Sequence, residues 1–308
     1  MVDPFEAEND DEWSQWFAAL LYNHKAKVIT AVTGQSNVFS LQNSNITHLP
    51  NRFFHESQGL TTLNLEGCSS LAQLPKSLGQ MQALTELNLD DCTSLMALPE
   101  SLGELQALTK LDLYSCSSLM ALPESLGQLQ ALTKLYLGSC ESLTALPESL
   151  GQLHALSALY LDECFSLAAL PESLGQLQAL TTLHLTKCTS LMAPPESFGQ
   201  LQALTTLVLC GCTSLVALPE SFGQLQALTE LYLAETSLMA LPESLAEALT
   251  ELNLRFCTSL AALPESLGQL QALTRLDLDG CSSLAALPES FGHLQALTTL
   301  YLGNCESL

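Results

Sequence analysis

The sequence predicts a curved α/β solenoid, a single elongated domain made of stacked coils, and two observations support this fold class. Close variants of L-x-L-x-x-C-x-S-L-x-x-L-P-E-S-L-G-Q-L-Q-A-L-T-x recur every 24 residues, and a fixed period of this length is typical of repeat proteins. Hydrophobic residues make up 47% of the chain, mostly as leucine at fixed places in the unit. This placement is expected when every coil buries one inner stripe.

The repeat divides the chain into an N-terminal capping segment, residues 1–38, and a solenoid, residues 39–308. A degenerate first coil begins at Phe39, so the solenoid holds about 11 coils and a partial one. One coil has only 21 residues, and its deletion either bends the stack or is a neutral change in a surface loop. The first leucines of the later coils are Leu63, Leu87, Leu111, Leu135, Leu159, Leu183, Leu207, Leu231, Leu252, Leu276 and Leu300.

Each coil contains a strand and a return path. The L-x-L stretch alternates inward leucines with outward residues, which predicts a short strand, and stacked copies form a parallel sheet. In the Leu-Pro-Glu-Ser-Leu-Gly stretch, proline presets the first helical turn and glycine limits its length, which predicts a short helix or 3₁₀ turn. Because these turns are bulkier than the strands, the stack must curve into a horseshoe. We expect the sheet on the concave face and the turns on the convex face.

The first 38 residues carry a different pattern. Apolar residues at Trp13, Trp16, Phe17, Leu20 and Leu21 follow helical spacing on one face. An amphipathic helix here most simply caps the first coil, which otherwise exposes its core; the alternative is a helix that docks onto a partner. The chain stops at Leu308, partway through a coil, so we expect a further C-terminal region or another chain to cover that end.

Charge and hydropathy limit the function classes. Nine Lys and Arg against 32 Asp and Glu give a formal charge of −23, which repels nucleic acid phosphates. No apolar run reaches the roughly 18 residues of a membrane helix, and acidic residues stand where a secretory signal carries basic ones. We therefore expect a cytoplasmic protein that binds neither nucleic acid nor membrane. The nine glutamates that follow a proline in the repeat are expected to form a solvated edge.

Ten of the 11 cysteines recur at one place in the repeat, where the strand ends and the side chain turns inward. We expect free, buried, structural thiols that bond to backbone groups of the turn. An odd total and the absence of a secretory signal argue against a disulfide framework, and a spacing of 24 does not suit zinc. The ten are Cys68, Cys92, Cys116, Cys140, Cys164, Cys188, Cys212, Cys257, Cys281 and Cys305.

The outward residues of the strand vary between coils, whereas the sequence of the convex segment hardly changes. Tyrosine and charged residues gather at these concave positions, and Tyr and Arg are residue types that carry interface energy. We expect a protein or peptide partner with basic residues, held by carboxylates and cation–π contacts; free drift after duplication is the alternative. The candidate partner-binding residues are Tyr114, Tyr136, Tyr160, His184, Tyr232, Tyr301, Lys110, Lys134, Asp162, Glu163, Glu230, Glu251, Arg255, Phe256 and Arg275.

Two parts of this set are singled out. Tyr136, Tyr160 and His184 form the densest aromatic run, and a second group surrounds the shortened coil. Enzymatic patterns are lacking, since no Ser-His-Asp order and no glycine-rich phosphate loop can be singled out. We therefore expect no catalytic residue, no metal and no cofactor. Cys210, the one cysteine off the repeated column, is expected to project from the concave side without a nearby base.

The unit L-x-L-x-x-C-x-S-L-x-x-L-P-x-S-L-G-x-L resembles leucine-rich repeats over residues 39–308. Its variant looks most like the repeat region of plant intracellular nucleotide-binding immune receptors and is also similar to Ras-related cytoplasmic scaffolds. The resemblance implies protein recognition in signal transduction or a defense response. The chain departs from those receptors in having no G-x-x-x-x-G-K-S/T loop. The alternatives are a structural scaffold holding two signalling partners and an acidic inhibitor that masks a basic protein.

Overall fold

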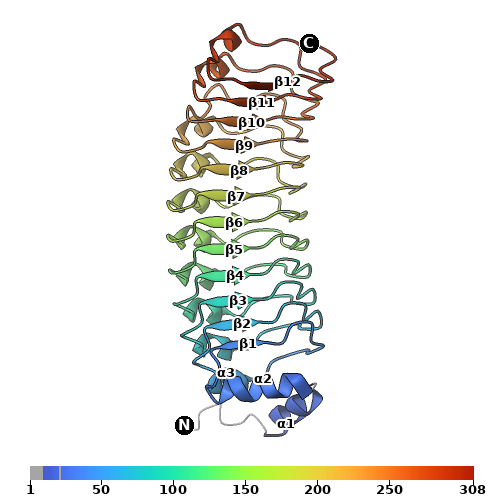
Figure 1. Ribbon diagram of the computed structural model, residues 1–308, viewed down its shortest axis with the longest axis vertical. Coiled ribbons are helices and arrows are strands. Elements are labelled where there is room, and N and C mark those ends of the chain that lie inside the picture. The colour runs from blue at the N-terminus through green and yellow to red at the C-terminus, as the bar shows by residue number, and fades with distance from the viewer. Residues whose placement is uncertain (1–9, 21) are drawn as a thin grey trace.

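The computed structural model describes residues 10–20 and 22–308. Within these residues, 12 short strands form one parallel sheet in which every strand lies beside its neighbours in sequence (Figure 1). The strands are β1 (Val38–Ser40), β2 (Thr62–Asn64), β3 (Glu86–Asn88), β4 (Lys110–Asp112), β5 (Lys134–Tyr136), β6 (Ala158–Tyr160), β7 (Thr182–His184), β8 (Thr206–Val208), β9 (Glu230–Tyr232), β10 (Glu251–Asn253), β11 (Arg275–Asp277) and β12 (Thr299–Tyr301).

The register of the sheet follows the repeat. The central leucine of each strand lies opposite the central leucine of the next, as Leu135 does opposite Leu159, and Phe39 takes that place in β1. From β1 to β11 these central side chains are fully or almost fully buried, and so are the leucines two residues further on, such as Leu137; in the last coil, Leu300 of β12 is exposed. Alternation along the strand then turns the residues on either side of the central leucine outward.

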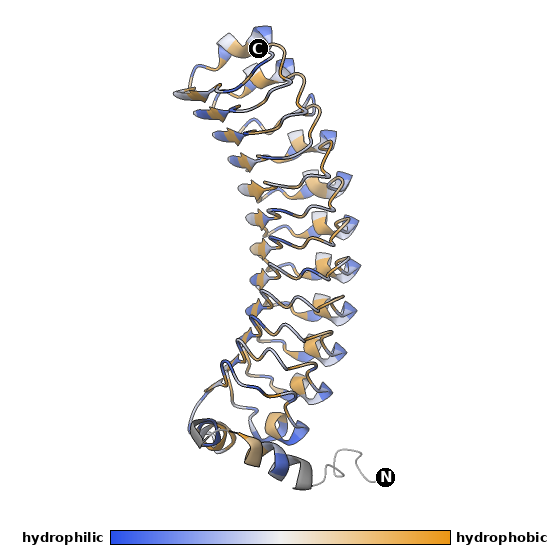
Figure 2. Ribbon diagram, turned by 90° about the vertical axis from the view of Figure 1, so that its right-hand side faces the viewer, coloured by the Kyte–Doolittle hydropathy of each residue, from blue (hydrophilic) through white to orange (hydrophobic). Residues whose placement is uncertain are grey.

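Short 3₁₀ segments return the chain on the opposite side of the coil. Each begins after a proline with φ near the helical value, such as Pro123 at −70°. The stack is a shallow arc with the strands on its concave side and the 3₁₀ segments on its convex side (Figure 2), so the predicted α/β solenoid is confirmed. The segments are η1 (Lys76–Gln80), η2 (Glu100–Glu104), η3 (Glu124–Gln128), η4 (Glu148–Gln152), η5 (Glu172–Gln176), η6 (Glu196–Gln200), η7 (Glu220–Gln224), η8 (Glu265–Gln269) and η9 (Glu289–His293).

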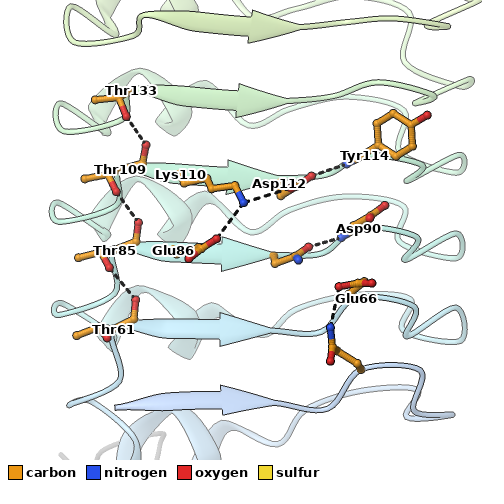
Figure 3. A network of polar contacts seen from close by, with 12 residues as sticks. Thr61, Glu66, Thr85, Glu86, Asp90, Thr109, Lys110, Asp112, Tyr114 and Thr133 are labelled. Atoms are coloured by element: carbon orange, nitrogen blue, oxygen red, sulfur yellow. Dashed lines mark hydrogen bonds and ion pairs between the residues drawn. The ribbon is translucent and has the colours of Figure 1, made fainter.

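Repeated side chains tie each coil to the next. At the start of the strands, Thr85 Oγ1 donates to the carbonyl oxygen of Thr61 at 3.0 Å, and Thr109 and Thr133 continue the ladder (Figure 3). After the strands, the buried thiol of Cys164 donates to the carbonyl oxygen of Leu137 at 3.2 Å, and the other cysteines of the column make equivalent bonds. All the cysteines are free thiols.

The convex glutamates have more than the solvated role that the sequence suggested. They are exposed, but the backbone N–H of Ser125 donates to the Glu100 carboxylate at 3.2 Å, and Glu148 accepts a similar bond from Ser173. Bonds from the Ser290 and Glu289 backbone lower the pKa of the Glu265 carboxyl. A glutamate of one coil therefore caps the start of the next coil's 3₁₀ segment.

The shortened coil keeps its strand register but loses its convex turn. Leu252 of β10 lies opposite Leu231 of β9, as in the full-length coils. No 3₁₀ segment is formed in the described residues between these two strands, and a hollow of about 430 Å³ lies beside Ser244 on that side. Thr236 replaces the cysteine of this coil, and its hydroxyl donates to the carbonyl oxygen of Leu233 at 2.8 Å. The shortened coil thus keeps its strand and loses its convex turn.

In the described part of the N-terminal end lie three α-helices: α1 (Asp10–Ala19), α2 (Tyr22–Val32) and α3 (Asn51–Glu56). Trp16 is buried against Phe53, and its Nε1–H donates to the carbonyl oxygen of His48 at 2.9 Å. Helix α1 therefore packs onto the first coil; Leu21, the last residue of the predicted apolar face, lies outside the described residues. Helix α2 was not predicted. Among the described helices, none has the length and hydropathy to cross a bilayer.

Candidate binding surface

The concave face of the sheet presents one outward residue on each side of every central leucine. Downstream of that leucine, β5 to β9 carry a row without formal charge, which we call the concave row: Tyr136, Tyr160, His184, Val208 and Tyr232. All five side chains are half-buried. The Tyr136 and Tyr160 rings stack with centroids 4.8 Å apart and planes 1° apart, and His184 meets Tyr160 edge-on at 5.0 Å. The parallel register places these rings one above another.

A basic group lies at the start of β4 and β5. Lys110 Nζ is 2.9 Å from Glu86 Oε1 and 3.7 Å from Asp112 Oδ2 (Figure 3). The ammonium also lies 5.5 Å from the centroid of the Tyr136 ring, which is a cation–π distance. Lys134, the neighbour of Lys110 in register, is exposed and has no ion pair within the described part of the chain.

Charged residues also follow the strands, in the turns at the other edge of the concave face. Lys187 Nζ lies 2.7 Å from Glu163 Oε1, and this hydrogen bond lowers the pKa of the Glu163 carboxyl. Both residues have positive φ, 59° and 61°, a conformation that favours glycine or asparagine. Asp162 Oδ2 is 3.9 Å from His184 Nδ1. The aromatic run and these charged side chains therefore belong to one continuous surface.

Tyr114 extends the aromatic area beyond the strand. Its ring is exposed and lies over the backbone of Gly138 in the next coil. A β-carbon at position 138 would meet the ring at 2.7 Å, closer than real β-carbon contacts allow. The glycine is thus what permits this ring to rest on the turn.

The second group surrounds β9 to β12. Glu230 and Glu251 are direct partners in register, and the hydroxyl of Tyr232 donates to Glu230 Oε2 at 3.4 Å. Burial, together with the charges of these two carboxylates, raises the pKa of Tyr232 to about 12. Arg275 Nε is 3.2 Å from Glu251 Oε1, and its guanidinium lies 5.2 Å from the Tyr301 ring centroid.

Arg255 and Phe256 complete this group from the turn after β10. Arg255 Nε is 3.2 Å from Asp279 Oδ2, and its guanidinium lies 4.5 Å from the Phe256 ring centroid. The outward residues directly before the central leucines form what we call the upstream column. Between the basic group and this second group, the upstream column is uncharged and consists of Ala158, Thr182 and Thr206. The candidate residues therefore form two charged groups joined by the concave row.

Comparison with solved structures finds the same architecture in several proteins. YopM, a leucine-rich effector protein from Yersinia pestis, is 24% identical over 94% of this chain and 80% of its own, with a TM-score of 0.64. The leucine-rich-repeat domain of the type III effector XopL is 23% identical over 96% of this chain and 91% of its own, with a TM-score of 0.56. This chain has the leucine-rich-repeat fold. No protein-family model matches the sequence, and no curated protein matches it.

Three residues of the concave surface were not among the candidates chosen from the sequence. Asp112 and Asp279 are the partners of Lys110 and Arg255, and Val208 fills the concave row between His184 and Tyr232. Aligning the coils at their central leucines puts all three at outward positions, so the repeat itself held the signal. Cys210 is half-buried, and burial raises the pKa of its thiol.

A second apolar surface runs along the flank between the strands and the 3₁₀ segments. Its larger members are exposed: Met96, Met120, Met192, Val216 and Met239. Alanine occupies the next position in these coils, and the two columns carry no charged side chain. This exposed flank lacks the polar groups that give an interface its specificity. Among the described residues, no cluster of His, Cys, Asp and Glu is arranged to hold a metal ion.

Proposed function

We propose that the concave sheet face of this leucine-rich-repeat protein is a non-catalytic surface for recognising another protein. The observation that carries the proposal is the stack of Tyr136, Tyr160 and His184 on a face where no other part of the described chain covers it. Half-buried rings held by their neighbours offer area to a partner at little cost in side-chain entropy. Tyrosine is also enriched among residues that dominate binding energy.

The charged residues support the same reading. Most basic side chains of the face are already held by a carboxylate of an adjacent coil, as in Lys110–Glu86, Lys187–Glu163 and Arg275–Glu251. Exposed pairs of this kind contribute little to stability, but they fix the positions of polar groups before a partner arrives. The net charge of −23 favours a partner that contributes basic residues.

We infer the cellular setting from the resemblance of the repeat variant. Its likeness to plant intracellular immune receptors and Ras-related scaffolds favours a cytoplasmic role in signal transduction or in a defense response. We propose this setting for the protein, with a protein partner and without nucleic acid or membrane. The same surface, extending over two charged groups, also suits a scaffold that holds two partners at once, and mass measurement of the complex distinguishes one bound partner from two.

Affinity capture from cells that express the protein tests the proposal. The triple variant Tyr136→Ala, Tyr160→Ala, Tyr232→Ala is compared with the parent and with Met96→Ala, Met120→Ala, Met192→Ala on the exposed flank. We expect partners kept by the parent and by the flank variant, and lost by the tyrosine variant while its far-UV CD spectrum stays unchanged. Identical capture by parent and tyrosine variant refutes a concave site, and loss only in the flank variant moves the site to the flank.

A further inference from the structure

Two residues of the upstream column stand out because their charges are not neutralised. The column carries Lys110 and Lys134 on β4 and β5 and, further along, Glu230 and Glu251 on β9 and β10. Lys110 is paired with Glu86, and Glu251 with Arg275. Lys134 and Glu230 have no ion pair in the described chain; Glu230 accepts only hydroxyl hydrogen bonds, from Thr206 and Tyr232 at 3.4 Å. This column therefore has a free cation on β5 and a free anion on β9.

The separation of these two charges determines how long a partner segment must be to contact both. They lie on β5 and β9, four strand steps apart, which corresponds to about 19 Å at the usual spacing of paired strands. The uncharged concave row fills the interval between them. A partner that satisfies both charges must therefore be apolar or aromatic over this length, with an acidic group at one end and a basic group at the other.

The spacing of the row distinguishes between two shapes of partner. The stacked rings follow one another at 4.8 and 5.0 Å. Successive turns of an α-helix are 5.4 Å apart, whereas side chains on one face of an extended chain recur only about every 6.7 Å. Strand addition is also excluded here, because β5 to β9 are hydrogen-bonded to a strand on both sides. A helix laid along the solenoid axis can meet each coil with one turn.

We propose that the concave face binds one amphipathic helix of a partner protein, about 13 residues between its end charges. Its apolar stripe covers the concave row, an acidic residue in its first turn meets Lys134, and a basic residue in its last turn meets Glu230. This order of charges also stabilises the helix itself, since it opposes the helix dipole at both ends. The inference rests on the proposed function and adds the shape and polarity of the partner.

A displayed library of single helices, four turns long and randomised on one face, provides the probe. Selection against the full chain should enrich helices with an apolar stripe, an acid in the first turn and a base in the last. The best binder is then synthesised, and its affinity is measured by fluorescence anisotropy. We expect Lys134→Glu and Glu230→Lys each to weaken binding at least tenfold, and the double variant to prefer the peptide with its end charges exchanged. Glu172→Lys on the convex side is the matched control and should leave affinity unchanged.

The outcomes separate the two proposals. Binders that depend on Tyr136 and Tyr160 but have equal affinity for both charge orders overturn the polarity and leave the concave site standing. A selection without any binder that depends on these tyrosines counts against both. Recovery of binding by the charge-exchanged peptide shows at the same time that the double variant is folded.

Discussion

Raising the pH from 7 to 9 should strongly destabilise the solenoid, because burial disfavours ionisation of the cysteine column. Nine cysteines are buried free thiols, and the Sγ–H of each donates to a backbone carbonyl at 3.1–3.3 Å. Burial raises the pKa of Cys164, Cys212 and Cys281 to about 12. The pKa of Cys116 is also raised well above its ordinary value, again by burial.

The sign and size follow from linkage. A thiol whose pKa is higher in the folded state stabilises the fold fully below the unfolded pKa, about 8.5, and that stability is lost as the pH rises toward the folded value. At pH 9 each strongly shifted thiol costs about 0.8 kcal/mol, so the seven buried thiols with the largest shifts together cost about 6 kcal/mol. A typical domain has about 5–15 kcal/mol in total. The expected loss is therefore a large part of the free energy of unfolding.

Urea denaturation followed by far-UV CD at pH 7, 8 and 9, in a reducing buffer, measures this loss. Asp and Glu are ionised throughout that range, and Lys and Tyr titrate above it. The midpoint should fall steeply between pH 8 and 9, and Cys164→Ala, Cys188→Ala should reduce the pH slope by about two thiols in seven. A free energy of unfolding that stays constant from pH 7 to pH 9 refutes the reasoning.

Three further substitutions test single features. His154→Gln should raise the free energy of unfolding by about 1 kcal/mol in urea titration, because glutamines in the equivalent position, such as Gln130, bridge their own coil to the next; an unchanged midpoint contradicts this. Glu163→Gly should leave the melting temperature unchanged or higher, since it removes a residue with φ 61°, yet weaken partner capture; a clearly lower melting temperature argues against strain. Gly138→Ala should cost about 1 kcal/mol, and Tyr114→Ala should abolish that cost in a double-mutant cycle; additive effects show that the ring and the glycine are not coupled.

The fold could be predicted from the sequence because every coil repeats the same residue pattern. Leu135 and Leu137 alternate with outward residues, and a helix-starting proline follows at a fixed distance, so period, strand, turn and curvature agree. Helix α2 could not be predicted in the same way. Its buried face consists of His24, Val28 and Ala31, which is too weak an apolar pattern to recognise in a single copy.

Details that depend on contact between coils were also beyond the sequence. The Glu100 carboxylate looked solvated because its partner, the Ser125 N–H, lies 25 residues away and is a backbone group. The missing 3₁₀ segment beside Ser244 depends on how the deletion was divided between the two sides of the coil. The concave candidates, by contrast, were visible, since side chains such as Tyr136 and Tyr160 become neighbours once the period is known.

In each coil, the residues that stabilise the fold are different from those that line the concave face. This separation explains why the concave face can serve recognition. Threonine, cysteine and glutamate columns bond one coil to the next at the strand start, the strand end and the convex side. The buried leucines supply the core, and the outward strand residues take no part in these ladders. Substitution at Tyr136 removes the stack on Tyr160, about 0.5–1.5 kcal/mol, and the cation–π contact of Lys110. Substitution at Tyr160 removes the same stack and the edge-on contact with His184, and both substitutions leave every ladder intact. Outward positions are therefore free to diverge without loss of the fold, which is the condition a binding surface on a repeat protein requires.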